Sequence, residues 1–274
     1  MHAKPFLSII TPVFNAEATL FKTISSIKNQ EFDDLEYIII DSNSKDNTSE
    51  IIRNHSSIID KYIVEEDNGI YDAMNKGIRL ARGELIGIIN ADDQYNLGSF
   101  KAVYNAFKEN DRETIFFSDL IVSDGIDSIT MQSENSLSSL LLGTASIAHP
   151  TMFVPREIYL KYGAFNLEFD TYGADRELIL RFKMNRIKFC KLKHKLSIFN
   201  FGGATSRYDL RNIIKQTKQE FNLLKSHLPL LITIKTTLKF FSRLIRNYFL
   251  SMIIPKKKFL KIRLNKLNKN KNLS

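Results

Sequence analysis

The chain has 274 residues, of which 43% are hydrophobic and 25% charged, as in ordinary globular proteins. This length allows one sizeable α/β domain with an appendage, or two small domains. A single cysteine, Cys190, excludes an intrachain disulfide, and we read it as a small packed residue of a strand. The start from Met1 to Pro5 shows no signal peptide, so we expect a cytoplasmic protein.

The net charge of +9 is unevenly distributed along the chain. Of the 39 Lys and Arg residues, 13 lie in residues 221–274, which contain no Asp or Glu. The first 220 residues therefore hold 26 basic and 30 acidic side chains and are mildly acidic. This balance argues against a nucleic-acid-binding body and assigns the basic character to a C-terminal tail.

The first part of the chain alternates between short apolar runs and helical patterns. Strands are predicted at 6–10, 37–40, 62–64 and 85–89, and helices at about 17–30, 46–52, 70–82 and 100–107. Gly83 is expected to close the helix over 70–82. The alternation predicts a doubly wound, largely parallel sheet over residues 5–118.

Beyond residue 114 the pattern becomes less regular. We expect strands at 115–117, within 119–131 and at 151–154, the last leading into Pro155 at the first position of a helix. A helix is predicted over 172–185, extended structure over 187–200, and a loop at Gly202-Gly203. Residues 133–147 are rich in Ser and Leu and allow no assignment.

The segment Asn90-Ala91-Asp92-Asp93 directly follows the buried strand predicted at 85–89. Ligands of open α/β sheets bind at the carboxyl ends of the strands. Two adjacent Asp side chains there favour a divalent cation that holds phosphate oxygens. The alternative is that such loops are polar simply because they lie at the surface.

Several motifs occur in a fixed order along the chain. They are Thr11-Pro12-Val13-Phe14-Asn15, Asp41 with Asp46-Asn47-Thr48, the segment 68–77, Asn90-Ala91-Asp92-Asp93, His149-Pro150, and Ala174-Asp175 with Arg181. Together, over about residues 5–200, they resemble the family 2 glycosyltransferases. The resemblance implies a GT-A fold, an α/β architecture with a Rossmann-like, mostly parallel central sheet flanked by helices. We expect this domain at 1–220 and a basic helical extension at 221–274.

The resemblance also implies which residues bind a nucleoside-diphosphate sugar, with a UDP-sugar favoured. The donor-binding residues would be Thr11, Pro12, Phe14, Asn15, Asp41, Asp72, Asn75, Asn90 and Asp92. In this assignment Asp41 accepts a hydrogen bond from the ring NH of uracil or a related base. The alternative for Asp41 is an N-cap or a structural partner of Lys45, and Asp46 is read as the N-cap of its helix.

The helix over 70–82 carries Asp72, Asn75, Lys76 and Arg79 along one face. This face could be solvated and hold only an Asp72–Lys76 pair, worth about 0.3–0.5 kcal/mol. We favour the functional interpretation. In it, Asp72 and Asn75 face the donor while Ile70 and Met74 pack inward.

By the same resemblance, Asp92 and Asp93 would bind Mn²⁺ or Mg²⁺ between the two phosphates of the donor. The cation would offset the charge that develops on the leaving diphosphate. Family members commonly have Asp where this chain has Asn90, which adds no charge. We favour Asp92 as the metal ligand, with Asp93 next.

Asp175 resembles the catalytic base of the family. Inversion by direct displacement needs one base for the acceptor hydroxyl and no protein nucleophile. Many relatives have Glu-Asp where this chain has Ala174-Asp175. The alternatives are a pairing of Asp175 with Arg176 or Arg181, or a base role for Asp170 or Glu177. His149 and Asp119 are expected at the pocket edge, near phosphate or acceptor.

The implied reaction is the inverting transfer of one hexosyl or N-acetylhexosaminyl group to a hydroxyl of a lipid-linked glycan acceptor. It would serve the synthesis of a surface polysaccharide such as O-antigen, capsule or exopolysaccharide. Processive relatives carry Gln-x-x-Arg-Trp, and this sequence has no Trp, which favours single addition. Two alternatives are a nucleotidyltransferase and a non-catalytic membrane-bound adaptor. The first lacks support because residues 11–15 form no Gly-rich phosphate loop.

The tail contains a basic amphipathic pattern between Pro229 and Pro255. Apolar side chains step by three or four, at Leu231, Ile234, Leu238, Phe241, Ile245, Tyr248 and Met252. Lys235, Lys239, Arg243 and Arg246 lie on another face, and Lys256-Lys257-Lys258 follow. We expect residues 229–274 to bind an anionic membrane surface and to hold the protein at the inner face of the cell membrane. The alternative is a helix that packs on the body.

Overall fold

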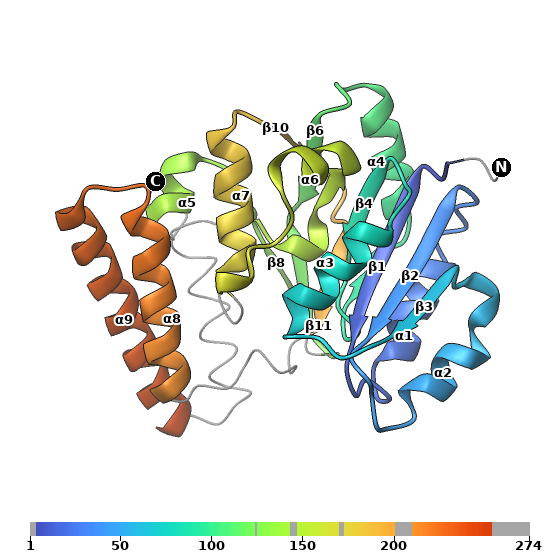
Figure 1. The fold of residues 1–274 in the computed structure, drawn as a ribbon, viewed down its shortest axis with the longest axis horizontal. Coiled ribbons are helices and arrows are strands. Elements are labelled where there is room, and N and C mark those ends of the chain that lie inside the picture. Colours follow the sequence, from blue (N-terminus) through green and yellow to red (C-terminus); the bar gives the residue numbers. More distant parts are fainter. Residues whose placement is uncertain (1–3, 124, 143–146, 170–172, 201–209, 254–274) are drawn as a thin grey trace.

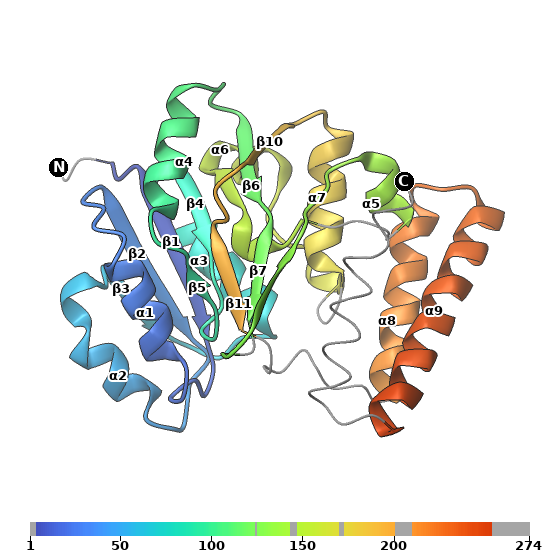
Figure 2. The same ribbon diagram turned by 180° about the vertical axis from the view of Figure 1, so that it is seen from behind.

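The computed structural model describes residues 4–123, 125–142, 147–169, 173–200 and 210–253. A seven-stranded sheet in the order β10-β6-β9-β4-β1-β2-β3 forms its centre (Figures 1 and 2). The strands are β1 (Leu7–Val13), β2 (Leu35–Asp41), β3 (Lys61–Val64), β4 (Leu85–Ile88), β6 (Thr114–Ser118), β9 (Phe153–Pro155) and β10 (Lys188–Leu192). All neighbours are parallel except β9, which pairs antiparallel with β4 and β6. The predicted α/β class with a mostly parallel sheet is confirmed.

Helices cover both faces of the sheet (Figures 1 and 2). One face carries α1 (Leu20–Lys28), α2 (Thr48–Asn54) and α4 (Ser99–Lys108), and the other carries α3 (Ile70–Leu80), α6 (Arg156–Tyr162) and α7 (Ala174–Met184). Strand residues alternate between the two cores: Ile9 packs with the first set of helices and Ile10 with the second. This double covering explains why the strands read as continuous apolar runs.

A second, smaller sheet adjoins the carboxyl ends of the central strands. Its order is β5-β11-β7-β8, formed by β5 (Gln94–Tyr95), β11 (Ser197–Asn200), β7 (Leu120–Ser123) and β8 (Ser128–Met131). The remaining short elements of the body are α5 (Leu137–Leu142) and the 3-10 turns Ser56–Ile58, His149–Thr151 and Leu167–Phe169. Because β5 follows the segment 90–93 and pairs with β11, this sheet brings residue 200 to the strand ends.

Three local predictions need correction. The helix predicted over 70–82 ends at Leu80, and Ala81 rather than Gly83 follows it. Gly83 instead lies against β1, where a Cβ would stand 2.5 Å from the backbone nitrogen of Ser8. Pro155 ends β9 and precedes α6, so it is not the first helical residue. The sheet also extends past residue 118, because β9 and β10 join it.

The C-terminal part is an antiparallel pair of helices, α8 (Leu210–Lys225) and α9 (Leu230–Ile253), at the end of the molecule opposite β3 (Figures 1 and 2). The expected domain boundary at 220/221 lies inside α8. Pro229 precedes α9 as predicted, whereas Pro255 and the three lysines after it lie outside the described residues. Among the described residues, no helix is both long and apolar enough to cross a bilayer.

Candidate functional site

The loops that follow β1 and β2 are tied together at the carboxyl edge of the sheet. Val13 pairs with Asp41 in the register of the two strands. The Asn15 carboxamide oxygen accepts from the backbone nitrogen of Lys45 at 2.8 Å, and the Ser44 hydroxyl accepts from the backbone nitrogen of Asn15 at 2.9 Å. The first two motifs of the sequence therefore form one surface.

Thr11 and Pro12 do not belong to this loop, which corrects the sequence-based assignment. Both lie within β1 and are buried, because the strand continues to Val13. The Thr11 hydroxyl accepts a hydrogen bond from the buried Tyr37 hydroxyl at 3.2 Å. The loop available to a ligand begins at Phe14, whose side chain is 63% exposed.

Asp41 is buried at the end of β2, and both of its carboxylate oxygens are engaged. One accepts from the Ser44 hydroxyl at 2.6 Å and from the Ser44 backbone nitrogen at 2.9 Å, and the other accepts from the Tyr62 hydroxyl at 2.9 Å. The alternative pairing with Lys45 is wrong, since the Lys45 ammonium instead donates to Asn43.

The sequence predicts Asp46 as the N-cap of α2, but Asn47 holds that position and Asp46 precedes it. Its carboxylate accepts from the backbone nitrogen of Thr48, the first residue of α2, at 3.1 Å, and from that of Glu17 at 3.1 Å. Burial alone would raise the pKa of Asp46, but the hydrogen bonds from the Thr48 hydroxyl and from the backbone nitrogens of Glu17 and Thr48 together outweigh it and lower the pKa. Asp46 is a structural residue of the two loops.

The face of α3 differs from the prediction. Asp72 accepts from the backbone nitrogen of Asn68 at 3.0 Å and lies 3.9 Å from Lys76. Met74 packs in the core, but Ile70 is exposed rather than packed inward. Asp72 thus braces the turn that enters α3.

The sequence predicts that Asn75 faces the donor, but its amide group instead joins two parts of the body. The Asn75 amide nitrogen donates to the Phe165 carbonyl, and the Asn75 carbonyl accepts from the Phe165 backbone nitrogen, both at 2.9 Å. Asn75 is buried, and both of its polar groups are used in these bonds. Its contribution to the site is to hold Phe165, which lines the pocket described below.

The segment after β4 holds one engaged and one free carboxylate. Asp93 is fully buried and accepts from the Asn200 backbone nitrogen at 3.1 Å and from the Asn90 amide at 3.3 Å. Asp92 is half-buried, and its carboxylate makes no hydrogen bond with the side chain or backbone of another described residue. Of the two, Asp92 therefore has the oxygens free for a ligand.

Both carboxyl groups of this segment are harder to ionise than usual. Burial, and then the charge of Asp92, raise the pKa of Asp93 to about 7. Burial also raises the pKa of Asp92. A cation beside them would offset this penalty.

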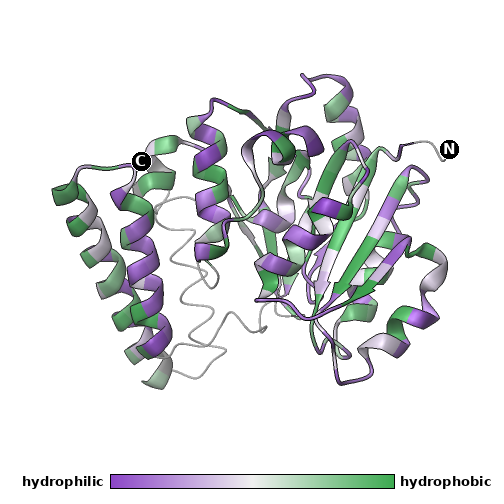
Figure 3. Cartoon of the chain, viewed as in Figure 1, coloured by the Kyte–Doolittle hydropathy of each residue, from purple (hydrophilic) through white to green (hydrophobic). Residues whose placement is uncertain are grey.

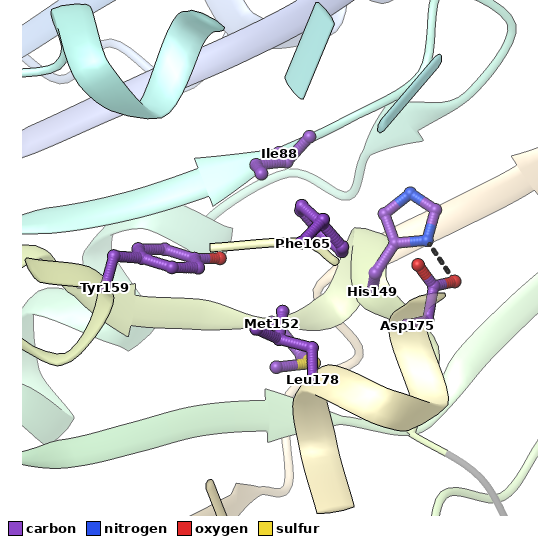
Figure 4. A pocket seen from close by; sticks show the side chains of 7 residues that line it. All are labelled: Ile88, His149, Met152, Tyr159, Phe165, Asp175 and Leu178. Atoms are coloured by element: carbon purple, nitrogen blue, oxygen red, sulfur yellow. Dashed lines mark hydrogen bonds and ion pairs between the residues drawn. The ribbon is translucent and has the colours of Figure 1, made fainter. Parts of the chain in front are cut away.

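Asp175, the base predicted from the sequence, forms a hydrogen bond with His149. His149 precedes β9 in the turn His149–Thr151, and Asp175 lies in the first turn of α7. The His149 Nδ1–H donates to Asp175 Oδ2 at 3.0 Å (Figure 4). Burial of the ring lowers the pKa of His149, but the Asp175 carboxylate, helped by Asp93 and Asp92, outweighs it and raises the pKa.

Each member of this pair keeps one unused polar atom. His149 Nε2 and Asp175 Oδ1 are buried and have no hydrogen-bond partner among the described residues. Both side chains line a small pocket with the apolar Ile88, Met152, Tyr159, Phe165 and Leu178. Figure 4 shows one ring nitrogen of His149 bonded to Asp175 and the other pointing away from it. Of the eleven buried side-chain atoms of this kind among the described residues, these two belong to side chains that line this pocket.

The alternative pairings of Asp175 are wrong. Arg176 donates to both oxygens of the buried Glu220 in α8, at 2.7 and 2.5 Å. Arg181 donates to the two carboxylate oxygens of Glu177 at 2.9 and 2.8 Å. Glu177, one of the two rivals for the role of base, is therefore already paired. The other rival, Asp170, lies outside the described residues.

Asp119, the second residue predicted at the pocket edge, is held between β7 and β10. Its carboxylate accepts from the Ser133 backbone nitrogen at 2.7 Å and pairs with Lys191 at 2.6 Å. These partners link the connection between β6 and β7 to β10 of the central sheet and to the segment after β8.

Asn200 is a site residue that the sequence did not reveal. Its backbone nitrogen donates to Asp93, and its amide donates to the Asp92 carbonyl at 2.6 Å. No local motif marks it, because the contact joins the end of β11 to a loop more than 100 residues earlier. Asn200 fixes the turn from which Asp92 extends.

The carboxylates of the segment after β4 suit a divalent cation that takes its remaining ligands from a substrate. Among the described residues, no group of three or more His, Cys, Asp or Glu side chains could hold a metal ion. Asp92 nevertheless offers free carboxylate oxygens, and the buried Asp93 lies beside it. Hard carboxylate oxygens combined with phosphate oxygens are the ligands that Mg²⁺ uses with nucleotides.

Comparisons with known proteins agree with this geometry. Residues 8–171, more than half of the chain, match the family described as Glycosyl transferase family 2. A PGL/p-HBAD biosynthesis glycosyltransferase of Mycobacterium bovis is 26% identical over 220 residues, which cover 78% of this chain and 84% of that protein. The GalNAc(5)-diNAcBac-PP-undecaprenol beta-1,3-glucosyltransferase of Campylobacter jejuni is 35% identical over 109 residues, 38% of this chain and 35% of that protein.

A solved structure shares the fold. The crystal structure of residues 1–349 of S. aureus TarS in complex with UDP-GlcNAc superposes with a TM-score of 0.67 at 15% identity. The match covers 92% of this chain and 77% of that one. At this identity the likeness concerns the fold alone.

Proposed function

The chain belongs to glycosyltransferase family 2 and has the GT-A fold, and from this we propose a specific reaction and a role for each site residue. As a member of this family it is an enzyme that transfers a sugar from a nucleotide sugar. The finer proposal is the inverting, single transfer of a hexosyl or N-acetylhexosaminyl group to a hydroxyl of a lipid-linked glycan. The observation that carries it is the buried His149–Asp175 pair with its two unpartnered atoms.

Asp175 acts as the general base in this proposal. Its Oδ2 is held by the Nδ1–H of His149, which leaves Oδ1 to accept the proton of the acceptor hydroxyl. The hydroxyl oxygen then forms a bond to the anomeric carbon from the face opposite the diphosphate. The bond from that carbon to the diphosphate breaks, and the leaving group takes the electron pair, which inverts the configuration.

His149 has two tasks in the same step. Its Nδ1–H fixes the orientation of the Asp175 carboxylate, and its Nε2 is available to a polar group of the substrate. The apolar walls formed by Ile88, Met152 and Leu178 keep bulk water from the base.

Asp92 would hold a divalent cation, Mn²⁺ or Mg²⁺, with Asp93 beside it. When bound, such an ion supplies Lewis-acid stabilisation of the leaving diphosphate. Asn200 and Asn90 fix the turn so that the Asp92 side chain is presented at the strand end.

The nucleotide would lie over the loops after β1 and β2. The exposed Phe14 offers a face on which a base can stack, and Asp41 offers an acceptor for a ring NH. A UDP-sugar fits these groups, and the TarS structure of the same fold was solved with UDP-GlcNAc. In this proposal Thr11, Pro12 and Asn75 do not contact the nucleotide sugar; they hold the elements around the site in place.

The acceptor is proposed to be lipid-linked, as the name of the C. jejuni relative states for that protein. The α9 helix supports an interfacial position at the inner face of the membrane. It packs on α8 through Phe240 and Leu244, with Ile245 and Tyr248 of the predicted stripe against them, while Leu231, Ile234, Leu238, Phe241 and Met252 of that stripe are exposed. Figure 3 shows that α9 is rich in hydrophobic residues. The alternative considered from the sequence, packing of the helix on the body, applies to part of the stripe, because Ile245 and Tyr248 pack against the cluster that contains Ile213 of α8.

The experiment that tests the reaction is turnover of a panel of nucleotide sugars. Purified protein with Mn²⁺ or Mg²⁺ should hydrolyse one donor slowly and transfer its sugar, with inverted configuration, to a hydroxyl acceptor. A panel covering UDP-, GDP-, dTDP- and CDP-sugars that gives neither binding nor hydrolysis would overturn the proposal. A retained configuration in the product would overturn the direct displacement.

The membrane contact is tested separately with liposomes. Lys235→Glu combined with Lys239→Glu should weaken binding to anionic vesicles strongly at low salt, because each basic residue contributes about 1 kcal/mol near such a surface. Lys188→Glu, on the body, is the matched control for a charge change elsewhere. Unchanged vesicle binding by the double variant would reject the role of α9.

A further inference from the structure

The outer side of the α8–α9 pair presents apolar side chains that neither the body nor the partner helix covers. The inner side of α8 is attached to the body through Glu220, bound to Arg176, and through Leu223 in the main core. The two helices pack on one another through Ile213, Phe240 and Leu244. These contacts use two sides of α8 and one side of α9.

The uncovered side chains come from both helices. On α8, Leu210 and Ile214 are exposed, and on α9 so are Leu231, Ile234, Leu238, Phe241, Phe249 and Met252. Exposed apolar patches of this extent on a folded protein mark an interaction surface.

Part of this surface is hollowed into an open groove between the two helices. It has a volume of about 360 Å³ and is lined by Ile214, Thr217, Lys218, Phe221, Thr237 and Phe241. A volume of this size lies within the range of small-molecule sites. Except for the Lys218 ammonium and two Thr hydroxyls, the lining side chains are hydrocarbon.

The charge around the groove selects among possible occupants. Residues 210–253 carry eight Lys and Arg side chains and one acid, Glu220. Glu220 is buried and already paired with Arg176, so it does not reduce the positive charge outside. A second copy of this hairpin would bring like charges together, whereas an anionic molecule is attracted.

We propose that the groove binds the hydrocarbon chain of a phosphate-headed membrane lipid, with Lys218 beside the phosphate. This site is distinct from the donor site and rests on the membrane contact proposed above. A chain seated between Phe221 and Phe241 buries its methylenes, and Lys218 pairs with the headgroup at the rim. The protein would thereby hold individual lipids and not only lie on the bilayer surface.

The lack of tryptophan in the sequence allows a clean fluorescence test. Phe241→Trp places one reporter in the groove, and Phe249→Trp places a matched reporter on the same helix outside the lining. The full-length variants are titrated with monomeric dodecyl phosphate and octyl phosphate. We expect a saturable blue shift at one lipid per chain for Phe241→Trp only, tightening by roughly fourfold per buried methylene.

Two further variants in the Phe241→Trp background identify the contacts. Ile214→Asp should weaken dodecyl phosphate binding by tenfold or more, and Lys218→Glu should weaken it while leaving an uncharged chain such as dodecanol unaffected. Both side chains are exposed, so neither change threatens the fold.

Three results would overturn the proposal. They are an equal response of the Phe249→Trp reporter, a response without dependence on chain length, or no response of the Phe241→Trp reporter, whether or not light scattering shows a dimer. Hydrolysis of a soluble UDP-sugar is measured in the same samples. Loss of hydrolysis with intact lipid binding would count against the donor site and not against the groove.

Discussion

The two ends of the central sheet both contain buried acidic side chains, but the pKa values of these side chains are shifted in opposite directions. At the amino end of β2, Glu36 is almost fully buried and accepts from the Ser8 hydroxyl at 2.6 Å, from Lys61 at 2.9 Å and from Arg82 at 2.7 Å. Burial alone would raise the pKa of Glu36, but these hydrogen bonds outweigh it and lower the pKa to about 2.

At the carboxyl end the partners are incomplete. The pKa of Asp93 is raised to about 7 by burial and by Asp92, and the free atoms of His149 and Asp175 face a pocket. The fold itself supplies all the partners of Glu36, whereas at the carboxyl end a ligand is needed to supply those of His149 and Asp175. We therefore expect changes at Glu36 to affect stability and changes at the other end to affect catalysis.

The largest effect should come from Asp175→Asn. It keeps the size of the side chain and removes the proton acceptor, so kcat should fall by about 100- to 10,000-fold. Nucleotide affinity should stay nearly unchanged, because Asp175 lies in the pocket with His149 and apart from the loops at Phe14 and Asp41. Transfer rates and UDP dissociation constants of both proteins measure this.

Glu177→Gln is the matched control for Asp175→Asn. Glu177 lies in the same first turn of α7 but pairs with Arg181, so kcat should change by only a few-fold. A loss of nucleotide binding in Asp175→Asn would remove this residue from the role of base.

At the opposite end, Glu36→Ala should destabilise the protein by about 3–5 kcal/mol, because it leaves Lys61 and Arg82 without their buried partner. Urea unfolding measures the change, and kcat at a temperature where the variant is folded should stay near the wild-type value. Glu84→Gln, which breaks a surface pair with the exposed Arg112, should cost about 0–1 kcal/mol. A variant at Glu36 that is as stable as Glu84→Gln would refute the contrast between the ends.

Two substitutions of His149 sharpen the assignment of its two nitrogens. His149→Ala removes the bond to Asp175 and should lower kcat about 10- to 100-fold, since hydrogen bonds to charged groups contribute about 1.5–3 kcal/mol. His149→Asn places an amide N–H near the position of Nδ1 and should recover most of this loss. Equal losses in the two variants would mean that Nε2, and not the orientation of Asp175, is what the reaction needs.

The pH dependence of stability should also differ between the two ends. With a chelator present, the folded protein keeps the Asp93 proton up to about pH 7, whereas the unfolded chain loses it near pH 4. Stability from this group is therefore present below about pH 4 and is lost as the pH rises through about 7. For Glu36 the sign is reversed: its contribution is present above about pH 4.5 and is lost as the pH falls through about 2.

Asp93→Asn should remove the loss of stability toward pH 7 and keep the loss toward pH 2 that is due to Glu36. Unfolding curves between pH 5 and 8 should show a decline in wild-type stability, on the order of 1–4 kcal/mol, that the variant lacks. A wild-type profile that is flat over this range would contradict the description of Asp93.

The sequence predicted the sheet well because its signals are local. Apolar runs such as 37–40 mark buried parallel strands, and the helices between them carry a 3.6-residue period. The order of motifs also placed Asp92 and Asp175 within one family pattern. The strand β9 could be located only roughly, because it has three residues and its antiparallel pairing with β4 depends on distant contacts.

The errors at the site arose from partners far apart in the sequence. Thr11 and Asn75 look like ligand-binding residues, but their polar groups are used by Tyr37 and Phe165, 26 and 90 residues away. In α9 the buried residues are Thr233 and Thr237 as well as Phe240 and Leu244, and the predicted apolar stripe contributes only Ile245 and Tyr248 to the packed side. Sequence periodicity does not reveal which polar side chains are paired with one another in the interior.

The central claim, that a nucleotide and a divalent cation complete the carboxyl end of the sheet, is tested most directly by thermal unfolding. UDP with Mn²⁺ at 100 times the dissociation constant should raise the Tm of the wild type by about 5–10 °C, and Asp92→Asn should lose the part that depends on Mn²⁺. No increase with UDP, GDP, dTDP or CDP and either metal, or an equal Mn²⁺-dependent increase in Asp92→Asn, would contradict the account.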